Sequence, residues 1–224
     1  MKNNKVTYLD KNLSRINKAL LNSIPEKNYS EITKAIHYSV MNGGKRMRPQ
    51  LMLLMAEALK VDVDKKTIDL MAAAGELIHC YSLIHDDLPA MDNSPIRRGK
   101  AANHVKFDHH TAILAGDGLL SWAFQIIGDS NFISNSEKRS EICFVLAKAV
   151  GPNGMVGGQQ ADMDFTNHKS IDLNQIEWIQ NHKTGALISC CAHVASILLN
   201  ASNDQKIKLI NYANHIGLAF QIAD

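Results

Sequence analysis

The chain has 224 residues, of which 46% are hydrophobic and 21% are charged, so its composition is that of a globular protein with material for one sizeable core. The formal net charge is +2, and acids and bases are interleaved. No acidic tail or basic arm indicates a nucleic-acid partner. We therefore expect a single domain whose charged residues act locally.

The N-terminal segment "MKNNKVTYLDKNLSRINKALL" carries charge throughout, so no secretory signal is visible and a cytoplasmic location is expected. The cysteines lack CxxC spacing and lie in apolar, helix-like stretches, which is typical of small buried side chains in a reducing compartment. We expect no disulfides. The cysteines are Cys80, Cys143, Cys190 and Cys191.

Apolar residues recur at helical spacing in segment after segment, beginning with Leu9, Leu13, Ile16 and Leu20, and no convincing run alternates with period two. The pattern predicts an all-α protein. Breaks fall at "NGGKRMRP", "MDNSPIRRGK" and "GPNG". Further helices are expected near residues 29–41, 48–59, 66–88, 111–127, 137–150, 154–165, 173–182, 184–200 and 203–224.

Residues 184–201 form an apolar stretch long enough to raise the question of a membrane span. Ser189, His193, Ser196 and the adjoining Lys183 argue against insertion. We interpret the stretch as a buried core helix.

The segment 66–88 is apolar on most of its circumference and belongs at the centre of a bundle. Its C-terminal end carries Asp86 and Asp87, where the helix dipole disfavours anions, so these carboxylates need a positive partner. On an ideal helix His79 and Asp86 point within about 20° of each other. Asp92 follows Pro89, and a turn there could return its carboxylate toward Asp86.

Carboxylates that converge in this way make an oxygen site suited to Mg²⁺, with positions left for water and substrate phosphates. The alternative is a solvated Asp-Asp pair at a helix end. The metal interpretation is favoured because two basic stretches accompany the acids. They contain Lys45, Arg46 and Arg48, and Arg97, Arg98 and Lys100.

Fixed cations beside a metal are the local chemistry of a polyphosphate ligand. Gly43 and Gly44 would let the backbone approach a phosphate. The Walker A pattern GxxxxGK[ST] is absent, however, and no strand precedes the glycines, so nucleotide hydrolysis by that route is disfavoured.

These residues resemble the trans-isoprenyl diphosphate synthase family, most closely its short-chain bacterial farnesyl diphosphate synthase type. The matching pieces are "GGKRMRP", "ELIHCYSLIHDDLPAMD", "RRGK", "NHVKF", "AGDGLL", "GMVGGQQADM", "HKTGALI" and "GLAFQIAD", in family order from residue 43 to 224. The resemblance implies an all-α bundle of isoprenoid-synthase type around a central cavity. It also implies a Mg²⁺-dependent prenyltransferase that condenses isopentenyl diphosphate with dimethylallyl or geranyl diphosphate to make geranyl and farnesyl diphosphate.

The same resemblance implies roles for individual residues. Mg²⁺ would be held by Asp86 and Asp92, with Asp87 in support and Asp224 opening a second aspartate-rich motif. Arg97 would contact the allylic diphosphate. The diphosphate of isopentenyl diphosphate would be bound by Lys45, Arg48, His79 and Arg98. The allylic site near the developing cation would be lined by Lys183, Thr184 and Gln221.

Product length is expected to depend on the residues just before Asp86. In the resembling short-chain enzymes an aromatic residue at the position of Tyr81 limits the product near fifteen carbons. On an ideal helix Tyr81 lies about 140° around from Asp86, whereas Ser82 is about 40° away, so helix geometry leaves both as candidates. A homodimer is expected as well, as in the resembling family.

The sequence departs from the family in two places. Asn93, Ser94 and Pro95 follow Asp92 where more acids are common. The sequence ends at Asp224, so we expect an isoprenyl diphosphate synthase domain over residues 1–224 that lacks the part after the start of the second motif. A truncated, noncatalytic helical subunit that binds a homologous synthase is therefore an alternative, and a metal phosphohydrolase built on "HDD" is another.

Several weaker signals have structural interpretations. Lys183 and Thr184 could begin a helix, Gln221 could satisfy backbone groups in a core, and His79 could be a buried imidazole. Two further interpretations, a helix that faces a cavity and close helix packing by small residues, apply to Gly157, Gly158, Gln159 and Asp162. We expect His109 and His110 to be exposed to solvent.

Overall fold

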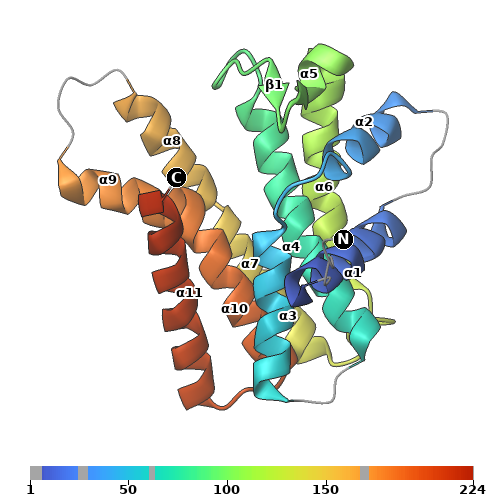
Figure 1. The fold of residues 1–224 in the computed structure, drawn as a ribbon, viewed down its shortest axis with the longest axis vertical. Coiled ribbons are helices and arrows are strands. Elements are labelled where there is room, and N and C mark those ends of the chain that lie inside the picture. Colours follow the sequence, from blue (N-terminus) through green and yellow to red (C-terminus); the bar gives the residue numbers. More distant parts are fainter. Residues whose placement is uncertain (1–6, 25–29, 61–63, 167–171, 224) are drawn as a thin grey trace, which may run out of the picture. The chain divides into compact units, whose positions relative to one another are not determined.

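The structure, a computed structural model, describes residues 7–24, 30–60, 64–166 and 172–223. These residues are mostly helical, with two short strands (Figure 1), which confirms the predicted all-α fold. The helices are α1 (Tyr8–Ser23), α2 (Glu31–Val40), α3 (Met47–Leu59), α4 (Lys65–Asp86), α5 (Asn103–Lys106), α6 (His109–Gly128), α7 (Ser136–Val150), α8 (Met155–Phe165), α9 (Leu173–Gln180), η1 (Asn181–Gly185), α10 (Ala186–Leu198) and α11 (Asn203–Ala223), and the strands are β1 (Ile96–Arg97) and β2 (Lys100–Ala101).

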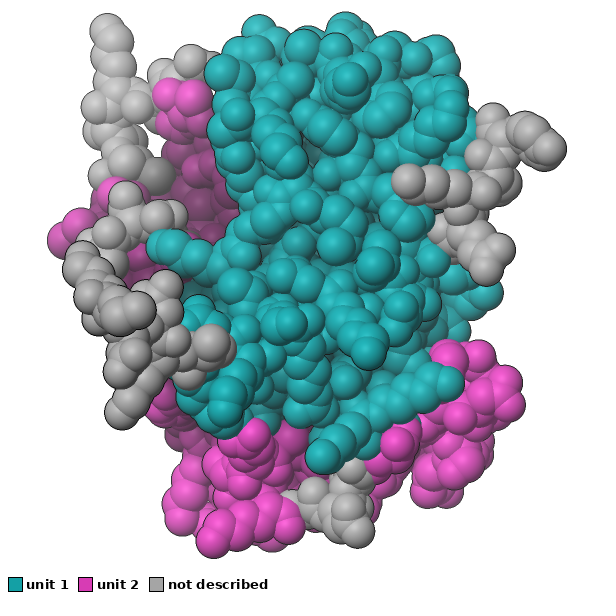
Figure 2. All heavy atoms as spheres, turned by 45° about the vertical axis from the view of Figure 1, so that its right-hand side comes forward, with its two compact units in different colours: residues 1–53, 65–126 teal, residues 54–64, 127–224 magenta. Residues whose placement is uncertain are grey.

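The chain divides into two compact units, drawn in different colours in Figure 2. Unit 1 contains Met1–Leu53 and Lys65–Ile126, and unit 2 contains Leu54–Asp64 and Ile127–Asp224. The expectation of a single domain stays a prediction.

Unit 1 is organised around α4, against which α1 and α2 pack. Nearly every residue of α4 from Thr67 to Ile84 is buried, as expected for a helix that is apolar on most of its circumference. Side chains on all sides of the helix therefore contribute to burial. The C-terminal end of α4 leads into the loop that carries β1, as Figure 1 shows.

The strands β1 and β2 form an antiparallel hairpin that the sequence did not predict, because each strand is only two residues long. Its turn residues Arg98 and Gly99 have φ angles of 52° and 76°. Positive φ at both positions matches the type I′ turn, whose twist suits a hairpin. Two residues from α2 and its C-terminal end anchor the strands: Tyr38 donates to the carbonyl oxygen of Ala101 at 2.8 Å, and Asn42 donates to that of Arg97 at 3.0 Å.

Unit 2 is organised around α10, which packs against α7 and α11. Most of α10 is buried, including Leu187, Ile188 and Ala192, so the predicted core helix in this region is confirmed.

By length and composition, one described helix could cross a membrane. This helix is α6, which contains Asp117. Such a helix is weak support for a membrane span, since core helices pass the same test.

All four cysteines are free, as predicted. Cys80, Cys190 and Cys191 are buried, but the prediction of burial is wrong for Cys143. This residue lies on the outer face of α7, next to the exposed Phe144, while Ile142 and Leu146 form the buried face. The apolar stretch therefore has an exposed side that its composition did not indicate.

The sequence predicted separate helices over residues 173–182 and 184–200, and this separation is wrong. The chain stays helical from α9 into α10 through η1, a π-helical turn over Asn181–Gly185. Gln180 and Ala186, on either side of the turn, both keep right-handed helical dihedrals. Such turns accommodate an extra residue without ending a helix and occur frequently at functional sites.

The burial of α10 gives a stability prediction. Leu187 is 1% exposed and Leu173 in α9 is 82% exposed. We expect Leu187→Ala to lower the free energy of unfolding by about 2–5 kcal/mol, because it removes buried methyl groups and leaves a cavity. Leu173→Ala should change it by less than about 0.5 kcal/mol. Urea unfolding followed by circular dichroism measures both, and equal losses would contradict the described burial.

Candidate active site

The acidic end of α4 turns back on itself. The amide of Asp92 donates to the carbonyl oxygen of Asp86 at 2.9 Å, and the amide of Asn93, with a φ of 49°, donates to that of Leu88 at 3.1 Å. The turn after Pro89 therefore brings the backbone of Asp92 beside Asp86, while the predicted approach of the two carboxylates stays a prediction. Among the described residues no group of three or more His, Cys, Asp or Glu side chains is arranged to hold a metal ion.

Arg97 joins this acidic end from β1. Its Nη2 lies 2.5 Å and its Nε 3.0 Å from Oδ1 of Asp87, whose side chain is only 2% exposed. Hydrogen bonds to Asp87 raise the pKa of Arg97, partly offset by burial, and the charges of Asp87, Asp86 and Asp92 raise it further. One guanidinium thus experiences all three predicted carboxylates, which supplies the compensation that the helix end requires.

Arg98 connects the two basic loops. Its Nη1 donates to the carbonyl oxygen of Gly43, and its Nη2 lies 3.8 Å from Oε1 of Glu76. A Cβ atom at Gly44, where φ is 113°, would lie 2.5 Å from Cζ of Arg98. Gly44 therefore both permits the turn and leaves space for the guanidinium.

Glu76 and Arg46 form a buried ion pair that the sequence analysis did not assign. Nη1 of Arg46 lies 2.7 Å from Oε1 of Glu76, and both side chains are 1% exposed. Arg46 also donates to Oδ1 of Asn17 and to the carbonyl oxygen of Val40. Arg46 is thus fixed inside unit 1. A glutamate in the apolar middle of the segment 66–88 was the signal that could have revealed this pair.

His79 stands one turn after Glu76, among the arginines. Burial of the ring and the charges of Arg48, Arg98, Arg46 and Arg97 hold its pKa well below the ordinary value. A neutral imidazole surrounded by guanidinium groups is an environment that favours an anion. Among the other predicted residues of this region, Lys45 is exposed and Arg48 is partly exposed.

The two candidates for product length lie on different sides of α4. Tyr81 is 6% exposed, and burial together with the charge of Asp86 raises its pKa to about 12. The phenol of Tyr81 therefore stays protonated, and it lies close enough to Asp86 for that carboxylate to affect its pKa. Ser82 is partly buried and donates to the carbonyl oxygen of His79 at 3.0 Å.

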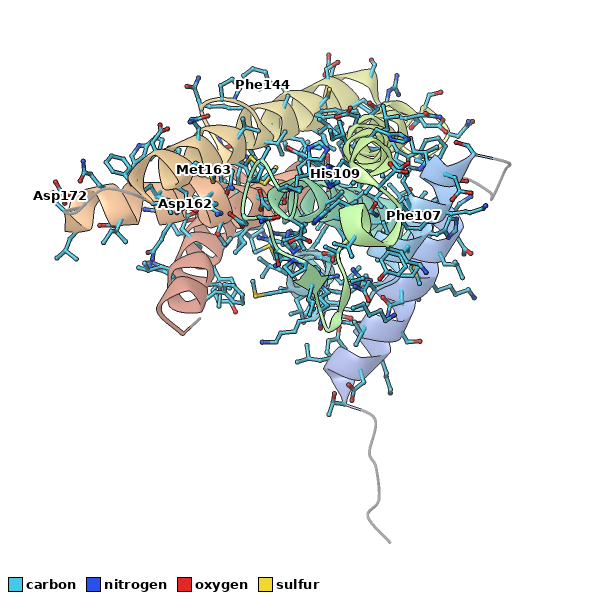
Figure 3. All side chains as sticks on the ribbon, turned by 90° about the horizontal axis from the view of Figure 1, so that it is seen from above. Phe107, His109, Phe144, Asp162, Met163 and Asp172 are labelled. Atoms are coloured by element: carbon cyan, nitrogen blue, oxygen red, sulfur yellow. The ribbon has the colours of Figure 1, made fainter. Side chains whose placement is uncertain are left out.

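Lys183 and Thr184 lie in the π-helical turn of unit 2. Nζ of Lys183 lies 2.6 Å from Oδ2 of Asp162 in α8, a residue labelled in Figure 3. A Cβ atom at Gly158 would lie 2.2 Å from the backbone nitrogen of Lys183, which supports the interpretation that this glycine permits close helix packing. Thr184 is partly buried. The chain is helical on both sides of Lys183 and Thr184, so the alternative interpretation that these residues begin a helix is wrong.

The remaining predicted residues are placed as follows. Gln221 belongs to α11, and Asp224 lies outside the described residues. His109 and His110 are exposed, as predicted. Figure 3 labels His109, the first residue of α6, and Phe107, which follows α5. His110 pairs with Asp108 at 3.0 Å.

The residues at the acidic end fit a hard divalent cation. Asp86 and Asp92 are joined through the backbone, and the charges of Asp86, Asp87 and Asp92 already act on one cationic side chain. Mg²⁺ is commonly held by one or two carboxylates together with waters and substrate phosphates. The donor set therefore suits this ion without a closed protein cage.

Comparisons with known proteins identify the family of the chain. Residues 29–224 match the polyprenyl synthetase family. The chain is 46% identical over 198 residues to the farnesyl diphosphate synthase of Geobacillus stearothermophilus, covering 87% of this chain and 65% of that protein. It is 45% identical to the enzyme of the same name from Micrococcus luteus, covering 95% of this chain and 71% of the relative. The chain thus spans about two thirds of the length of these relatives.

Two solved structures are similar over 96% of the chain. One is an FPP/GFPP synthase from Zymomonas mobilis, with 37% identity, a TM-score of 0.90 and 78% of that chain covered. The other is a geranyltransferase from Legionella pneumophila, with 39% identity, a TM-score of 0.91 and 76% covered. The protein belongs to the polyprenyl synthetase family and has its all-α isoprenoid-synthase fold.

The buried ion pair gives the second prediction. Arg46→Met leaves Glu76 buried beside a hydrophobic side chain, so we expect a loss of about 3–5 kcal/mol in the free energy of unfolding. Arg46→Met combined with Glu76→Leu should recover part of this loss, because no buried carboxylate then remains without Arg46, although Arg98 loses the counter-charge that lies 3.8 Å away. Urea unfolding compares the single and double variants, and a double variant as unstable as the single one would contradict the assignment.

The third prediction concerns His79 and pH. Its pKa in the folded state lies well below 6.5, so protons bind preferentially to the unfolded chain. The stability contributed by the neutral ring is complete above about pH 6.5 and is lost as the pH falls toward the folded-state pKa. His79→Gln should lose stability less steeply than the wild type between about pH 7 and 5. Parallel pH profiles of chemical unfolding for the two proteins would argue against the buried neutral imidazole.

Proposed function

We propose that the protein is a prenyltransferase that condenses isopentenyl diphosphate with dimethylallyl or geranyl diphosphate, forming geranyl and farnesyl diphosphate. The observation that carries this proposal is the paired arrangement in unit 1. The charges of Asp87, Asp86 and Asp92 raise the pKa of Arg97, which pairs with Asp87, and the charges of four arginines help to hold the pKa of His79 low. Two diphosphate substrates need this combination: an acidic site that binds a metal ion and a separate basic site that binds an anion.

The names of the relatives support the same chemistry. Geobacillus stearothermophilus and Micrococcus luteus provide farnesyl diphosphate synthases, and Capsicum annuum provides a geranylgeranyl pyrophosphate synthase that is 40% identical over 217 residues. Product length therefore varies among similar proteins. We propose the farnesyl product because Tyr81 stands where the resembling short-chain enzymes have their limiting aromatic residue.

Magnesium fits the first substrate site in this proposal. Asp86 and Asp92 would hold it, with Asp224 contributing from the second motif and Asp87 in support through Arg97. When bound, the ion supplies electrophilic stabilisation of the negative charge that accumulates on the departing allylic diphosphate.

The side chains of the protein act on the same charge. Arg97, fixed by Asp87, would donate to the allylic diphosphate as the C–O bond breaks. Lys183, Thr184 and Gln221 are also proposed for the allylic site, because "HKTGALI" and "GLAFQIAD" resemble motifs of the family. Because the guanidinium of Arg97 is already oriented, little reorganisation is needed as charge develops.

The second diphosphate would occupy the basic cluster. Arg98 is held by Gly43, while Arg48, Lys45 and His79 complete the donors proposed for isopentenyl diphosphate. Binding there would place the double bond to attack the allylic carbon. Loss of a proton from the adduct to the departed diphosphate then completes a five-carbon extension.

A cytoplasmic location and a homodimer remain parts of this proposal. The alternative of a noncatalytic subunit predicts a purified protein without turnover that alters the product of a homologous synthase. A phosphohydrolase would cleave a phosphate ester without isopentenyl diphosphate, and it leaves the connected basic loops of Arg46 and Arg98 unexplained.

The fourth prediction tests the proposed reaction. Diphosphate release should require Mg²⁺, an allylic diphosphate and isopentenyl diphosphate together. Asp86→Asn should lower the rate by about 10²-fold or more, the scale for removing one electrostatic partner of a transition state. Asp204→Asn, at an exposed carboxylate paired with Lys208 in α11, is the matched control and should leave the rate unchanged. Release from one diphosphate alone would reject the transferase.

A further inference from the structure

His85 connects α4 to α6, and the proposed transferase mechanism gives it no role. Its Nε2 lies 3.0 Å from the carbonyl oxygen of Ile113 in α6. The ring of Tyr81 meets the ring of His85 edge to face, with centroids 5.8 Å apart and an interplanar angle of 80°. Because a carbonyl oxygen can only accept, His85 carries its proton on Nε2 in this contact.

Gly116 provides the space that His85 occupies. A Cβ atom at Gly116 would lie 2.1 Å from Nε2 and 2.5 Å from Cδ2 of His85. No side chain larger than hydrogen leaves room for the imidazole in this position. The ring of His85 is thus confined by the backbone of α6 beneath it and by Tyr81 beside it.

Tyr81 and His85 are four residues apart, so their side chains share one face of α4. Tyr81 is 6% exposed and cannot turn freely unless a neighbour moves. The hydrogen bond to Ile113 restrains the ring of His85. The restrained ring in turn packs against the ring of Tyr81 on the side of α6. A change at Gly116 would therefore reach Tyr81 through His85, without altering either side chain chemically.

We propose that His85, seated on Gly116, is a positioning residue that holds Tyr81 in place and so sets the length of the product. The proposal rests on the proposed function, in which Tyr81 limits chain growth. Without the imidazole, the Tyr81 ring can turn into the vacated space toward α6. The growing hydrocarbon chain then gains the room that the tyrosine occupied.

The test is the product distribution of purified variants supplied with geranyl and isopentenyl diphosphates. His85→Ala and Gly116→Ala should each raise the ratio of longer products to farnesyl product by about 2- to 13-fold, the scale of losing one edge-to-face aromatic contact. Tyr81→Ala should raise it at least as much. Adding Gly116→Ala to Tyr81→Ala should cause no further increase, because both changes act through one side chain.

Gly118→Ala is the matched control in the same helix. A Cβ atom at Gly118 would lie 3.4 Å from Cδ1 of Ile36 and 3.5 Å from Cδ1 of Ile32, close to ordinary contact distances. Both alanines favour the helix equally. If Gly116→Ala gives the same products as Gly118→Ala while Tyr81→Ala lengthens them, the role of His85 is overturned and the transferase function stands. If Tyr81→Ala leaves the products unchanged, the stop at Tyr81 fails and the role of His85 fails with it.

A second measurement does not depend on turnover. The protein contains five tyrosines, so labelling with 3-fluorotyrosine gives few ¹⁹F resonances, and Tyr81→Phe identifies the one from Tyr81. That resonance should shift in Gly116→Ala and stay in place in Gly118→Ala. An unshifted resonance in both variants would overturn the contact, whereas a shift in a protein that transfers no prenyl group would reject the proposed function alone.

Discussion

The carboxylate of Glu76 is the interaction on which the basic side of unit 1 depends. Its Oε1 faces Arg46 at 2.7 Å and Arg98 at 3.8 Å, and the side chain is 1% exposed. Arginines gathered around His79 repel one another, and an interior counter-charge offsets part of that repulsion. The same oxygen also links loop 43–46 to the hairpin turn at Arg98. Charge balance and loop geometry therefore have one origin.

The acidic end of α4 solves the opposite problem. Carboxylates at a helix C-terminus meet the negative end of the dipole, and Asp87 in addition loses solvent. Arg97 offsets both costs, because β1 presents its guanidinium to the three acids of the turn. The hairpin thus contributes to both charged regions: Arg97 pairs with Asp87 at the acidic end of α4, and the neighbouring Arg98 lies near Glu76. A two-residue turn with positive φ makes this divergence possible.

The sequence predicted the long helices because their apolar periodicity extends over many turns, and it predicted the acid and base clusters because charged residues crowd between them. It did not predict the hairpin, because strands of two residues are too short to show an alternating pattern. It also did not predict that Arg46 is buried, because nothing in the local sequence distinguishes a buried arginine from an exposed one. It also predicted separate helices over residues 173–182 and 184–200, where the structure stays helical through η1. Only tertiary packing distinguishes these cases.

The places where regular secondary structure is interrupted are also the places where candidate site residues gather. In η1 the widened turn is packed at Gly158 so closely that a Cβ atom would meet the backbone of Lys183. A regular α-helix through residues 181–185 would rotate Lys183 away from its present direction, and its 2.6 Å contact with Asp162 would then be lost. The π-helical turn is therefore held by packing from outside the helix and by one ion pair, rather than by the helix-forming tendency of its own residues. The local sequence alone could not reveal it.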